Sequence, residues 1–168
     1  MSSRPDFCLG IDPGLSGSLA LLDLGTRKIH TIWDMPTKDG TIYPGGVAMV
    51  VDMAKSIASA QLVAVVENVN SRPGQAHMWA FALGVGIIHG CLGALDVPFH
   101  LVAPQQWKSS FGLRRVGDES QAGTKARARE IAARLWPDNA NLFARVKDAD
   151  RAEAALLARF FCTKQGWV

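Results

Sequence analysis

The chain has 168 residues, of which 48% are apolar and 20% are charged, and its formal net charge is +3. This length and composition are typical of one globular domain and exclude a disordered or disulfide-rich secreted chain. Cys8, Cys91 and Cys162 are widely spaced and form neither a CxxC pair nor a zinc pattern, so we expect buried, reduced thiols. With no apolar signal segment after Met1, these features favour a cytoplasmic protein.

Five short apolar runs predict β-strands. Residues 7–11, 18–24 and 28–33 are joined by short turns, so we expect these three strands to pair antiparallel. Residues 62–67 and 99–102 each follow a helical segment, and we expect them to join the first strand in parallel. The order predicts an α/β fold with a mixed five-stranded sheet flanked by helices, in which the first strand lies beside the fourth.

Several segments between and after the strands show helical spacing of apolar residues or helix boundary signals. The predicted helices cover residues 44–60, 104–110, 125–136 and, approximately, 149–161. Residues 35–43 are expected to form a polar loop. Residues 111–124 are polar and punctuated by glycine, so we expect a mobile loop there.

Residues 76–95 form an apolar segment long enough to be considered as a transmembrane helix. The segment contains His77 and His89, lacks flanking basic anchors and carries four glycines, so we expect a buried, closely packed helix of the core. Its small residues would let another helix approach closely: Ala76, Ala80, Gly84, Gly86, Gly90 and Ala94. That neighbour is either a helix of the same chain or a second subunit.

Two of the predicted strands end in a carboxylate. Asp12 follows the first strand in Gly10-Ile11-Asp12-Pro13-Gly14, and Glu67 ends the fourth. Ligand sites in open α/β sheets form where the carboxyl ends of neighbouring strands meet, so both side chains are expected in one crevice. Asp12 also fits simple turn punctuation. Glu67, directly after an apolar run, needs a partner.

A third acidic group opens the last helix. Asp150 and Glu153 are three residues apart, so they share a helix face and can reach one ion, although the same spacing also fits a capping box. Asp148 cannot share that face and is predicted to be a helix cap or an exposed loop acid. Converging carboxylates need a cation between them, and oxygen ligands favour Mg²⁺ or Mn²⁺. We therefore predict two Mg²⁺ ions and phosphodiester hydrolysis at four catalytic, metal-binding residues: Asp12, Glu67, Asp150 and Glu153.

Basic residues are concentrated between Lys108 and Arg134, where seven basic residues accompany three acidic ones. A basic segment beside an acidic metal site suits a polyanionic substrate such as a nucleic acid. A solvated helix face would have the same composition, so this segment leaves both readings open.

Four motifs together resemble the RuvC family of Holliday junction resolvases. They are Gly10-Ile11-Asp12-Pro13-Gly14, Val65-Val66-Glu67, Pro104-x-x-Trp107-Lys108 and the run from Asp150-Arg151-Ala152-Glu153 to Ala158. They follow one another in this order over nearly the whole chain, which looks closer to the phage-like branch than to the housekeeping bacterial enzyme. The resemblance implies an RNase H-like fold, with residues 1–168 forming a single nuclease domain. It also implies a homodimer that resolves four-way DNA junctions with Mg²⁺, in the cytoplasm of a bacterium or of a phage-infected host.

The resemblance also assigns roles to residues. It implies that the four acids named above hold the metals, that Lys108 and Lys125 contact the DNA backbone, and that the dimer seam lies near the helix at 76–95. We expect further DNA contacts from Arg72, Gln106, Arg114 and Arg115. Two positions depart from the family pattern. Glu153 stands where the bacterial enzyme usually has aspartate, and Asn70 stands where an aromatic residue is common, which leaves the cleavage-sequence preference open.

Other functions remain as alternatives. A nuclease of the same fold could act on flaps, RNA–DNA hybrids or packaging DNA. A junction-binding protein that does not cleave is a further alternative, against which the retention of all the carboxylates argues. The glycine-rich turn after Asp12 also resembles the phosphate turn of actin-like sugar kinases, but those proteins use two such domains and 168 residues hold one.

Overall fold

The computed structural model describes residues 4–59, 61–69, 78–114, 117 and 120–168. Five strands form one sheet in the order β3-β2-β1-β6-β7. Their bounds are β1 (Phe7–Asp12), β2 (Ser18–Asp23), β3 (Ile29–Asp34), β6 (Leu62–Glu67) and β7 (Phe99–Val102). The first three pair antiparallel, whereas β6 pairs parallel to β1 and β7 parallel to β6. The predicted mixed sheet is confirmed.

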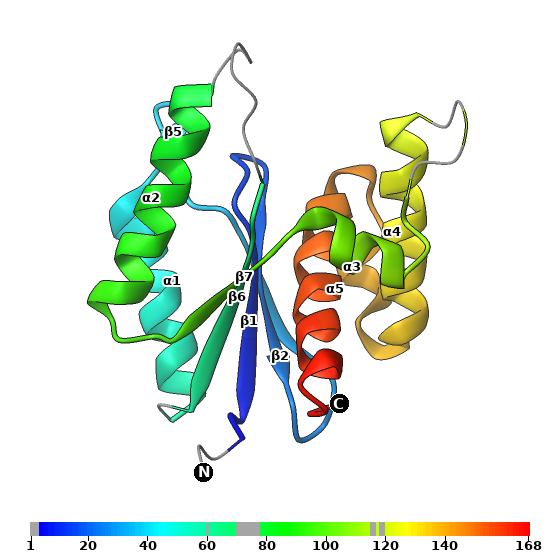
Figure 1. Ribbon diagram of the computed structural model, residues 1–168, viewed down its shortest axis with the longest axis horizontal. Helices are drawn as coiled ribbons and strands as arrows, with labels where there is room; N and C mark the ends of the chain where they lie inside the picture. The colour runs from blue at the N-terminus through cyan, green and yellow to red at the C-terminus, as the bar shows by residue number, and fades with distance from the viewer. Residues whose placement is uncertain (1–3, 60, 70–77, 115–116, 118–119) are drawn as a thin grey trace.

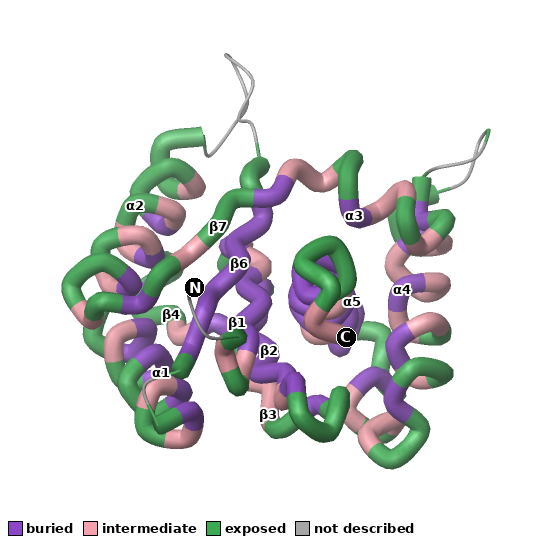
Figure 2. The backbone as a smooth tube through the Cα atoms, turned by 60° about the horizontal axis from the view of Figure 1, so that its bottom comes forward, coloured by how far each residue is buried: buried purple, intermediate pink, exposed green. Residues whose placement is uncertain are grey.

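Helices cover both faces of this sheet (Figure 1). On one face lie α1 (Pro44–Ile57) and α2 (Met78–Ala94), and on the other lie α3 (Pro104–Ser110), α4 (Gln121–Leu135) and α5 (Ala149–Lys164). Figure 2 shows α5 between the sheet and α4, with most of its turns buried. Two 3₁₀ helices, η1 (Pro137–Phe143) and η2 (Val146–Asp148), connect α4 to α5. Among the described residues, none of the helices has the length and apolar character that a membrane crossing requires.

Three segments differ in secondary structure from the sequence prediction. Helix α1 ends at Ile57 instead of residue 60, and Ser59 beyond it has a positive φ, which a right-handed helix does not allow. The expected polar loop at 35–43 contains a small hairpin of β4 (Thr37–Lys38) and β5 (Thr41–Ile42), whose turn residues Asp39 and Gly40 both have positive φ. Strands of two residues are too short to show an alternating pattern. Helix α4 begins four residues earlier than predicted because the Ser120 side chain accepts the N–H of Gly123 as an N-cap. The predicted mobile loop before it lies partly outside the described residues.

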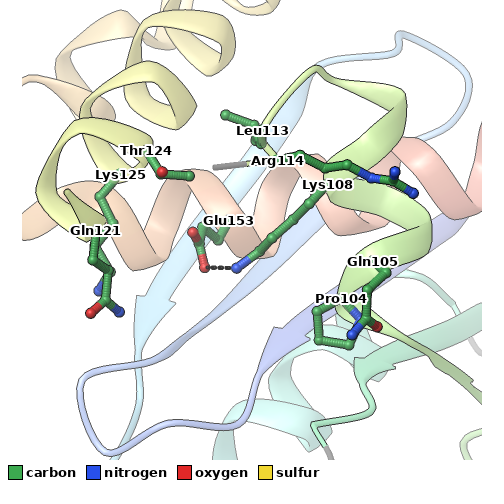
Figure 3. Close-up of a pocket in the computed structure, with 9 residues that line it drawn as sticks. All are labelled: Pro104, Gln105, Lys108, Leu113, Arg114, Gln121, Thr124, Lys125 and Glu153. Carbon is green, nitrogen blue, oxygen red and sulfur yellow. Dashed lines mark hydrogen bonds and ion pairs between the residues drawn. The ribbon is translucent and has the colours of Figure 1, made fainter. Parts of the chain in front are cut away.

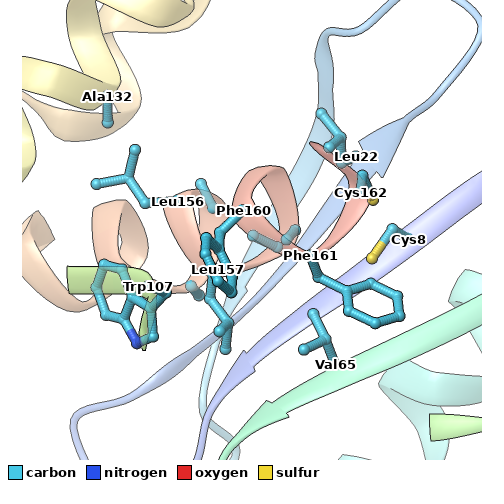
Figure 4. Close-up of a cluster of buried hydrophobic side chains, with 14 of the residues drawn as sticks. Cys8, Leu22, Val65, Trp107, Ala132, Leu156, Leu157, Phe160, Phe161 and Cys162 are labelled. Carbon is cyan, nitrogen blue, oxygen red and sulfur yellow. The ribbon is translucent and has the colours of Figure 1, made fainter. Parts of the chain in front are cut away.

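Alternate residues of the strands face opposite layers of helices. Cys8 and Val65 belong to the apolar cluster under α5, of which Figure 4 shows a part, whereas Leu9 and Val66 belong to the cluster under α1 and α2. Because both faces of β1 and β6 are buried, each strand is apolar along its whole length rather than alternating. This pattern made both strands predictable from the sequence.

All three cysteines are free thiols, as expected. Cys8 and Cys162 are buried and hydrogen-bonded to each other, and burial raises the pKa of Cys8 well above its usual value. Cys91 is only partly buried, between α2 and the start of α1, where its thiol contacts the carbonyl of Pro44. The expectation of a buried thiol therefore fits two of the three.

Helix α2 is much less buried than a core helix. The expectation of a fully packed helix is wrong for its outer face, where the Trp79 side chain is 80% exposed and Leu83 is 45% exposed. Phe81, expected in the core, is only partly buried. Because α2 is apolar on every side, its sequence favours burial on every side, but α1 and the sheet cover only one side of it. The buried residues of α2 are Gly84, Ile88 and Leu92.

Gly10 is the point at which α5 touches β1. A Cβ added there would overlap the carbonyl oxygen of Ala154 and lie 2.9 Å from the Cβ of Ala158. We expect Gly10→Ala to push α5 off the sheet and lower the free energy of unfolding by about 1–3 kcal/mol in urea titrations. The control is Gly93→Ala, where an added Cβ meets no atom within 4 Å and alanine favours the helix. Equal stability of Gly10→Ala and the unmodified protein would contradict this packing.

Candidate functional site

Neighbouring parallel strands bring two carboxylates to one edge of the sheet. Gly10 of β1 lies opposite Val65 of β6, and both belong to the side of the sheet that α5 covers. Asp12 and Glu67 each come two residues later on their strands. Because side chains alternate along a strand, both acids point toward α5. The predicted juxtaposition of the two strand ends is thus present in the fold.

The first turn of α5 adds two more carboxylates. Asp150 and Glu153 are buried, with exposed fractions of 6% and 7%. One ligand oxygen each from Asp12, Asp150 and Glu153 lie within 4.8 Å of one another, and we call these three residues the carboxylate cluster. Hard divalent cations take oxygen ligands at roughly 2.0–2.6 Å, so a single ion between these oxygens could contact all three.

Glu67 lies beside the carboxylate cluster with partners of its own. Its Oε1 accepts a hydrogen bond of 2.8 Å from the indole Nε1 of Trp107 on α3, a side chain that is 1% exposed. The Nζ of Lys108 lies 3.9 Å from the same oxygen and 3.2 Å from Oε2 of Glu153. Glu67 is therefore oriented by a buried donor. The sequence motif contained Trp107, but nothing in the sequence indicated that its indole contacts Glu67.

A second lysine reaches the cluster from α4. The Nζ of Lys125 lies 2.6 Å from Oδ1 of Asp150. Burial alone would lower the pKa of Lys125, but the hydrogen bond and charge of Asp150 outweigh it and the pKa is raised. The side chains of Lys108 and Lys125 remain 27% and 36% exposed. Both ammonium groups thus lie between the acids and solvent.

The acids of the site repel one another strongly. Burial, together with the charges of Glu67, Asp150 and Glu153, raises the pKa of Asp12 from 3.8 to about 8, although the N–H of Gly14 donates to its Oδ1 at 3.2 Å. Burial also raises the pKa of Glu67, against the opposing effects of Lys108 and Trp107. The two lysines therefore supply too little positive charge to keep every acid ionised. A divalent cation would supply the remainder.

Ser18 is a further oxygen donor beside the carboxylate cluster. It pairs with Asp12 across the β1–β2 ladder and is 1% exposed. Within the described part of the chain its hydroxyl has no hydrogen-bond partner. The atoms of Asp12, Ser18, Asp150 and Glu153 that could bind a metal are all oxygen atoms, which hard cations prefer. Sequence reasoning missed Ser18 because a serine at the start of a strand carries no distinctive signal.

Asp148 plays a different part from the other acids of this segment. It stands at the N-cap position of α5, as one of the predicted alternatives had it, but its side chain makes no cap hydrogen bond. It is not the exposed loop acid of the other alternative, since it is 1% exposed. Its carboxylate accepts the backbone N–H and the guanidinium of Arg145, both at 2.8 Å. An arginine fork therefore satisfies this acid instead of helix N–H groups.

The same acid belongs to a network that anchors the start of α5. Arg151 lies 3.7 Å from Asp148 and makes two hydrogen bonds, of 2.6 and 2.7 Å, to Asp34 at the end of β3. Because Arg151 is flanked by Asp150 and is two residues from Glu153, this pair fixes the turn of α5 that carries both acids.

Of the residues predicted to contact DNA, four lie in the described parts of the chain: Gln106, Lys108, Arg114 and Lys125. Arg72 and Arg115 lie outside them, as does Asn70. The Arg114 side chain donates to the Ser109 hydroxyl at 2.6 Å. The Gln106 carboxamide accepts the N–H of Ala103 at 3.2 Å and so closes the first turn of α3.

The comparisons with known proteins concern the fold. No protein-family model matches the chain, and no curated protein sequence matches it. Thermus thermophilus RuvC in complex with a Holliday junction substrate superposes with a TM-score of 0.62 at 15% identity, over 96% of both chains. A second T. thermophilus RuvC structure gives 0.59 at 17% identity, over 95% of this chain and 96% of that one. The chain has the RNase H-like fold of RuvC.

A eukaryotic structure shows the same likeness. The yeast mitochondrial Holliday junction resolvase Ydc2 superposes with a TM-score of 0.55 at 21% identity, covering 99% of this chain and 80% of that one. Likeness at such low identity reflects a shared arrangement of elements. The likeness therefore concerns the fold and not the chemistry of the site.

The raised pKa of Asp12 makes the stability of the metal-free protein depend on pH. A carboxyl whose pKa is raised from 3.8 to about 8 on folding favours the folded state while it is protonated, so its contribution is fully present below about pH 4 and is lost progressively as the pH rises to about 8. In buffer with a chelator, we expect Asp12→Asn to match the unmodified protein near pH 4 and to be the more stable of the two near pH 9. Urea titrations at both pH values measure the difference. A difference that does not grow with pH would contradict the assignment.

We expect Asp148→Asn to lower the free energy of unfolding by about 1.5–3 kcal/mol, because it weakens charge-assisted hydrogen bonds to a buried carboxylate. The control is Asp52→Asn on the exposed side of α1, which should stay within roughly 0.5 kcal/mol of the unmodified protein. Urea titrations give both values. Unchanged stability with lost Mg²⁺ binding would instead place Asp148 among the metal ligands.

Proposed function

We propose that this protein is an endonuclease that resolves four-way DNA junctions by divalent-metal-dependent phosphodiester hydrolysis, with residues 1–168 acting as one nuclease domain. The observation that supports it best is the convergence of Asp12, Asp150 and Glu153, with Glu67 beside them, at one edge of a RuvC-like sheet. A RuvC of this fold has been solved with a Holliday junction substrate.

In this proposal Asp12, Glu67, Asp150 and Glu153 hold two Mg²⁺ ions, and Mn²⁺ can take their place. Bound there, such ions would activate water for attack on the phosphodiester and stabilise the leaving oxygen. The protein contributes orientation: the buried Trp107 indole holds Glu67 in place. The close approach of α5 to β1 holds the other acids together.

Basic side chains next to the acids supply the contact with the DNA backbone. Lys108 and Lys125 lie within 4 Å of the acids and remain partly exposed, and the exposed Arg114 follows α3. Cations at this spacing attract phosphates and position the strand without reading its sequence. Not every basic residue of this segment is available for DNA, since Arg129 donates to the carbonyl of Ala144 at 3.2 Å.

We expect Asp12→Asn and Glu67→Gln to reduce cleavage of a four-way junction at least about a thousandfold while leaving junction binding intact or improved, because each removes a ligand charge but no basic residue. The assay compares a four-way junction, a flap, an RNA–DNA hybrid and linear duplex with Mg²⁺, and Asp52→Asn serves as the control. Cleavage at the normal rate by either variant would refute the site. Preferred cleavage of one of the other substrates would refute junction resolution but would still support a nuclease.

We also propose that the protein is a homodimer, since two identical sites related by a two-fold axis can cut opposed strands symmetrically. The outer face of α2 supports this proposal. It presents Trp79 and Leu83 to solvent, and a Cβ added at Gly86 or Gly90 would meet no atom within 4 Å in the described chain. A second copy of α2 could therefore approach this face closely.

We expect light scattering at micromolar concentration to give the mass of a dimer, and Leu83→Glu to give that of a monomer. The substitution places a charge on an apolar face and should not disturb the fold, because Leu83 is 45% exposed. The control is Val146→Glu in η2, where the side chain is 83% exposed on another part of the molecule. A monomeric unmodified protein that still cuts both strands would contradict the dimer.

A further inference from the structure

A cavity of about 530 Å³ opens beside the carboxylate cluster (Figure 3). It lies between α3, the turn that follows it, the first turns of α4, and Glu153 of α5. Glu153 lines the cavity and belongs to the carboxylate cluster as well. Any group that fills the cavity therefore sits next to the strand that the cluster would cut. Its volume is within the range of small-molecule sites, roughly 300–1,000 Å³.

The walls of the cavity combine apolar and amide surface. Pro104 and Leu113 supply the apolar part. Gln105 of α3 and Gln121 of α4 supply carboxamides, and Figure 3 shows them on opposite sides, with Glu153 between them. Each carboxamide offers one acceptor oxygen and two N–H donors. A planar heterocycle with donors and acceptors along its edge matches such walls better than a bare anion does.

Thr124 gives independent evidence that a polar ligand belongs here. It lines the cavity, is 7% exposed, and its hydroxyl has no hydrogen-bond partner in the described part of the chain. A buried hydroxyl without a partner is unfavourable. A ligand atom in the cavity could supply the missing hydrogen bond.

The wall after α3 is held in place by α4. The guanidinium of Arg127 donates to the carbonyl of Gly112 at 2.7 Å and to that of Arg114 at 3.1 Å. These bonds fix the turn that carries Leu113 and so preserve the cavity. The side chains of Lys108, Arg114 and Lys125 also line it and supply positive charge for phosphates. Apolar wall, amides and cations together describe a site for a nucleotide.

We propose that this cavity receives one unstacked nucleotide of the DNA strand held at the carboxylate cluster, and that Gln105, Gln121 and Thr124 read its base. The inference rests on the proposed function, which brings a DNA strand to the cluster. Glutamine amides can pair in bidentate fashion with base edges, as they do with adenine. The side chains of Lys108, Arg114 and Lys125 would hold the phosphates on either side of the base. The cavity would then give the enzyme a preference for one base near the cut.

The first test uses binding without cleavage. The Asp12→Asn protein is mixed with four-way junctions that carry the fluorescent base 2-aminopurine at one position, moved in turn through the nucleotides next to the branch point. We expect a several-fold rise in fluorescence at one position, because a base leaves the stack. A second substitution in the Asp12→Asn protein, Thr124→Val or Gln121→Ala, should remove at least about half of that rise. Thr124→Ser keeps the hydroxyl and should retain it, and Gln165→Ala, outside the cavity, is the matched control.

The second test measures base preference in the active protein. Junctions with each of the four bases at the responsive position should be cut at rates that differ by about tenfold, as loss of one good base contact predicts. The rates should become nearly equal in the double variant Gln105→Ala/Gln121→Ala. The assignment of the cavity would be overturned if no position gave a rise in fluorescence on binding. Equal rises in Thr124→Val, Thr124→Ser and Gln165→Ala would also overturn it.

The two proposals fail in different ways. Base unstacking that depends on Thr124, in a protein that cuts no nucleic acid with Mg²⁺, would support the cavity and refute the nuclease. Metal-dependent junction cleavage with neither unstacking nor base preference linked to the cavity residues would support the nuclease and refute the cavity. A protein that binds no DNA at all would overturn both.

Discussion

The contact between α5 and β1 is the constraint on which the site depends. Gly10 has no side chain, so the backbone of α5 at Ala154 and the Ala158 methyl group can lie directly on the strand. One helical turn before Ala154 stands Asp150, and two residues after Gly10 stands Asp12. A bulkier residue at Gly10 would move these acids apart, and the oxygens of the cluster would exceed the span that one cation can bridge. Packing in the apolar core thus sets the electrostatics at the edge of the sheet.

Two aspartates near the start of α5 and the end of β1 show how surroundings separate a structural acid from a candidate metal ligand. The pKa of Asp148 is lowered, because hydrogen bonds from Arg145 outweigh its burial. The pKa of Asp12 is raised to about 8, because burial and three neighbouring carboxylates oppose its ionisation. Asp148 is therefore complete as it stands and ties η2 to α5. Asp12 needs a further cation, which is the property expected of a metal ligand.

The two faces of the sheet divide the proposed tasks. On one face, α3, α4 and α5 surround the carboxylate cluster and the cavity. On the other, α2 presents Trp79 and Leu83 to solvent. Two subunits that meet through α2 would each keep the cluster open to a DNA strand. In the proposed dimer, the exposed apolar face of α2 would be buried, and the two sites would match the two equivalent strands of a junction.

The sequence by itself determined the sheet order and the residues of the cluster. A continuous apolar run marked β6, and a short run interrupted by His100 marked β7. Carboxylates at strand ends marked Asp12 and Glu67, and helical spacing marked Asp150 and Glu153. Only the tertiary structure decided which side chains meet these acids. The Trp107 contact with Glu67, the fork of Arg145 on Asp148, and the cavity at Thr124 join elements far apart in the chain. Periodicity shows which face of an element is apolar, but only the packing of the whole chain shows what covers that face. For this reason the sequence predicted a core helix for α2, whereas the structure leaves its outer face exposed.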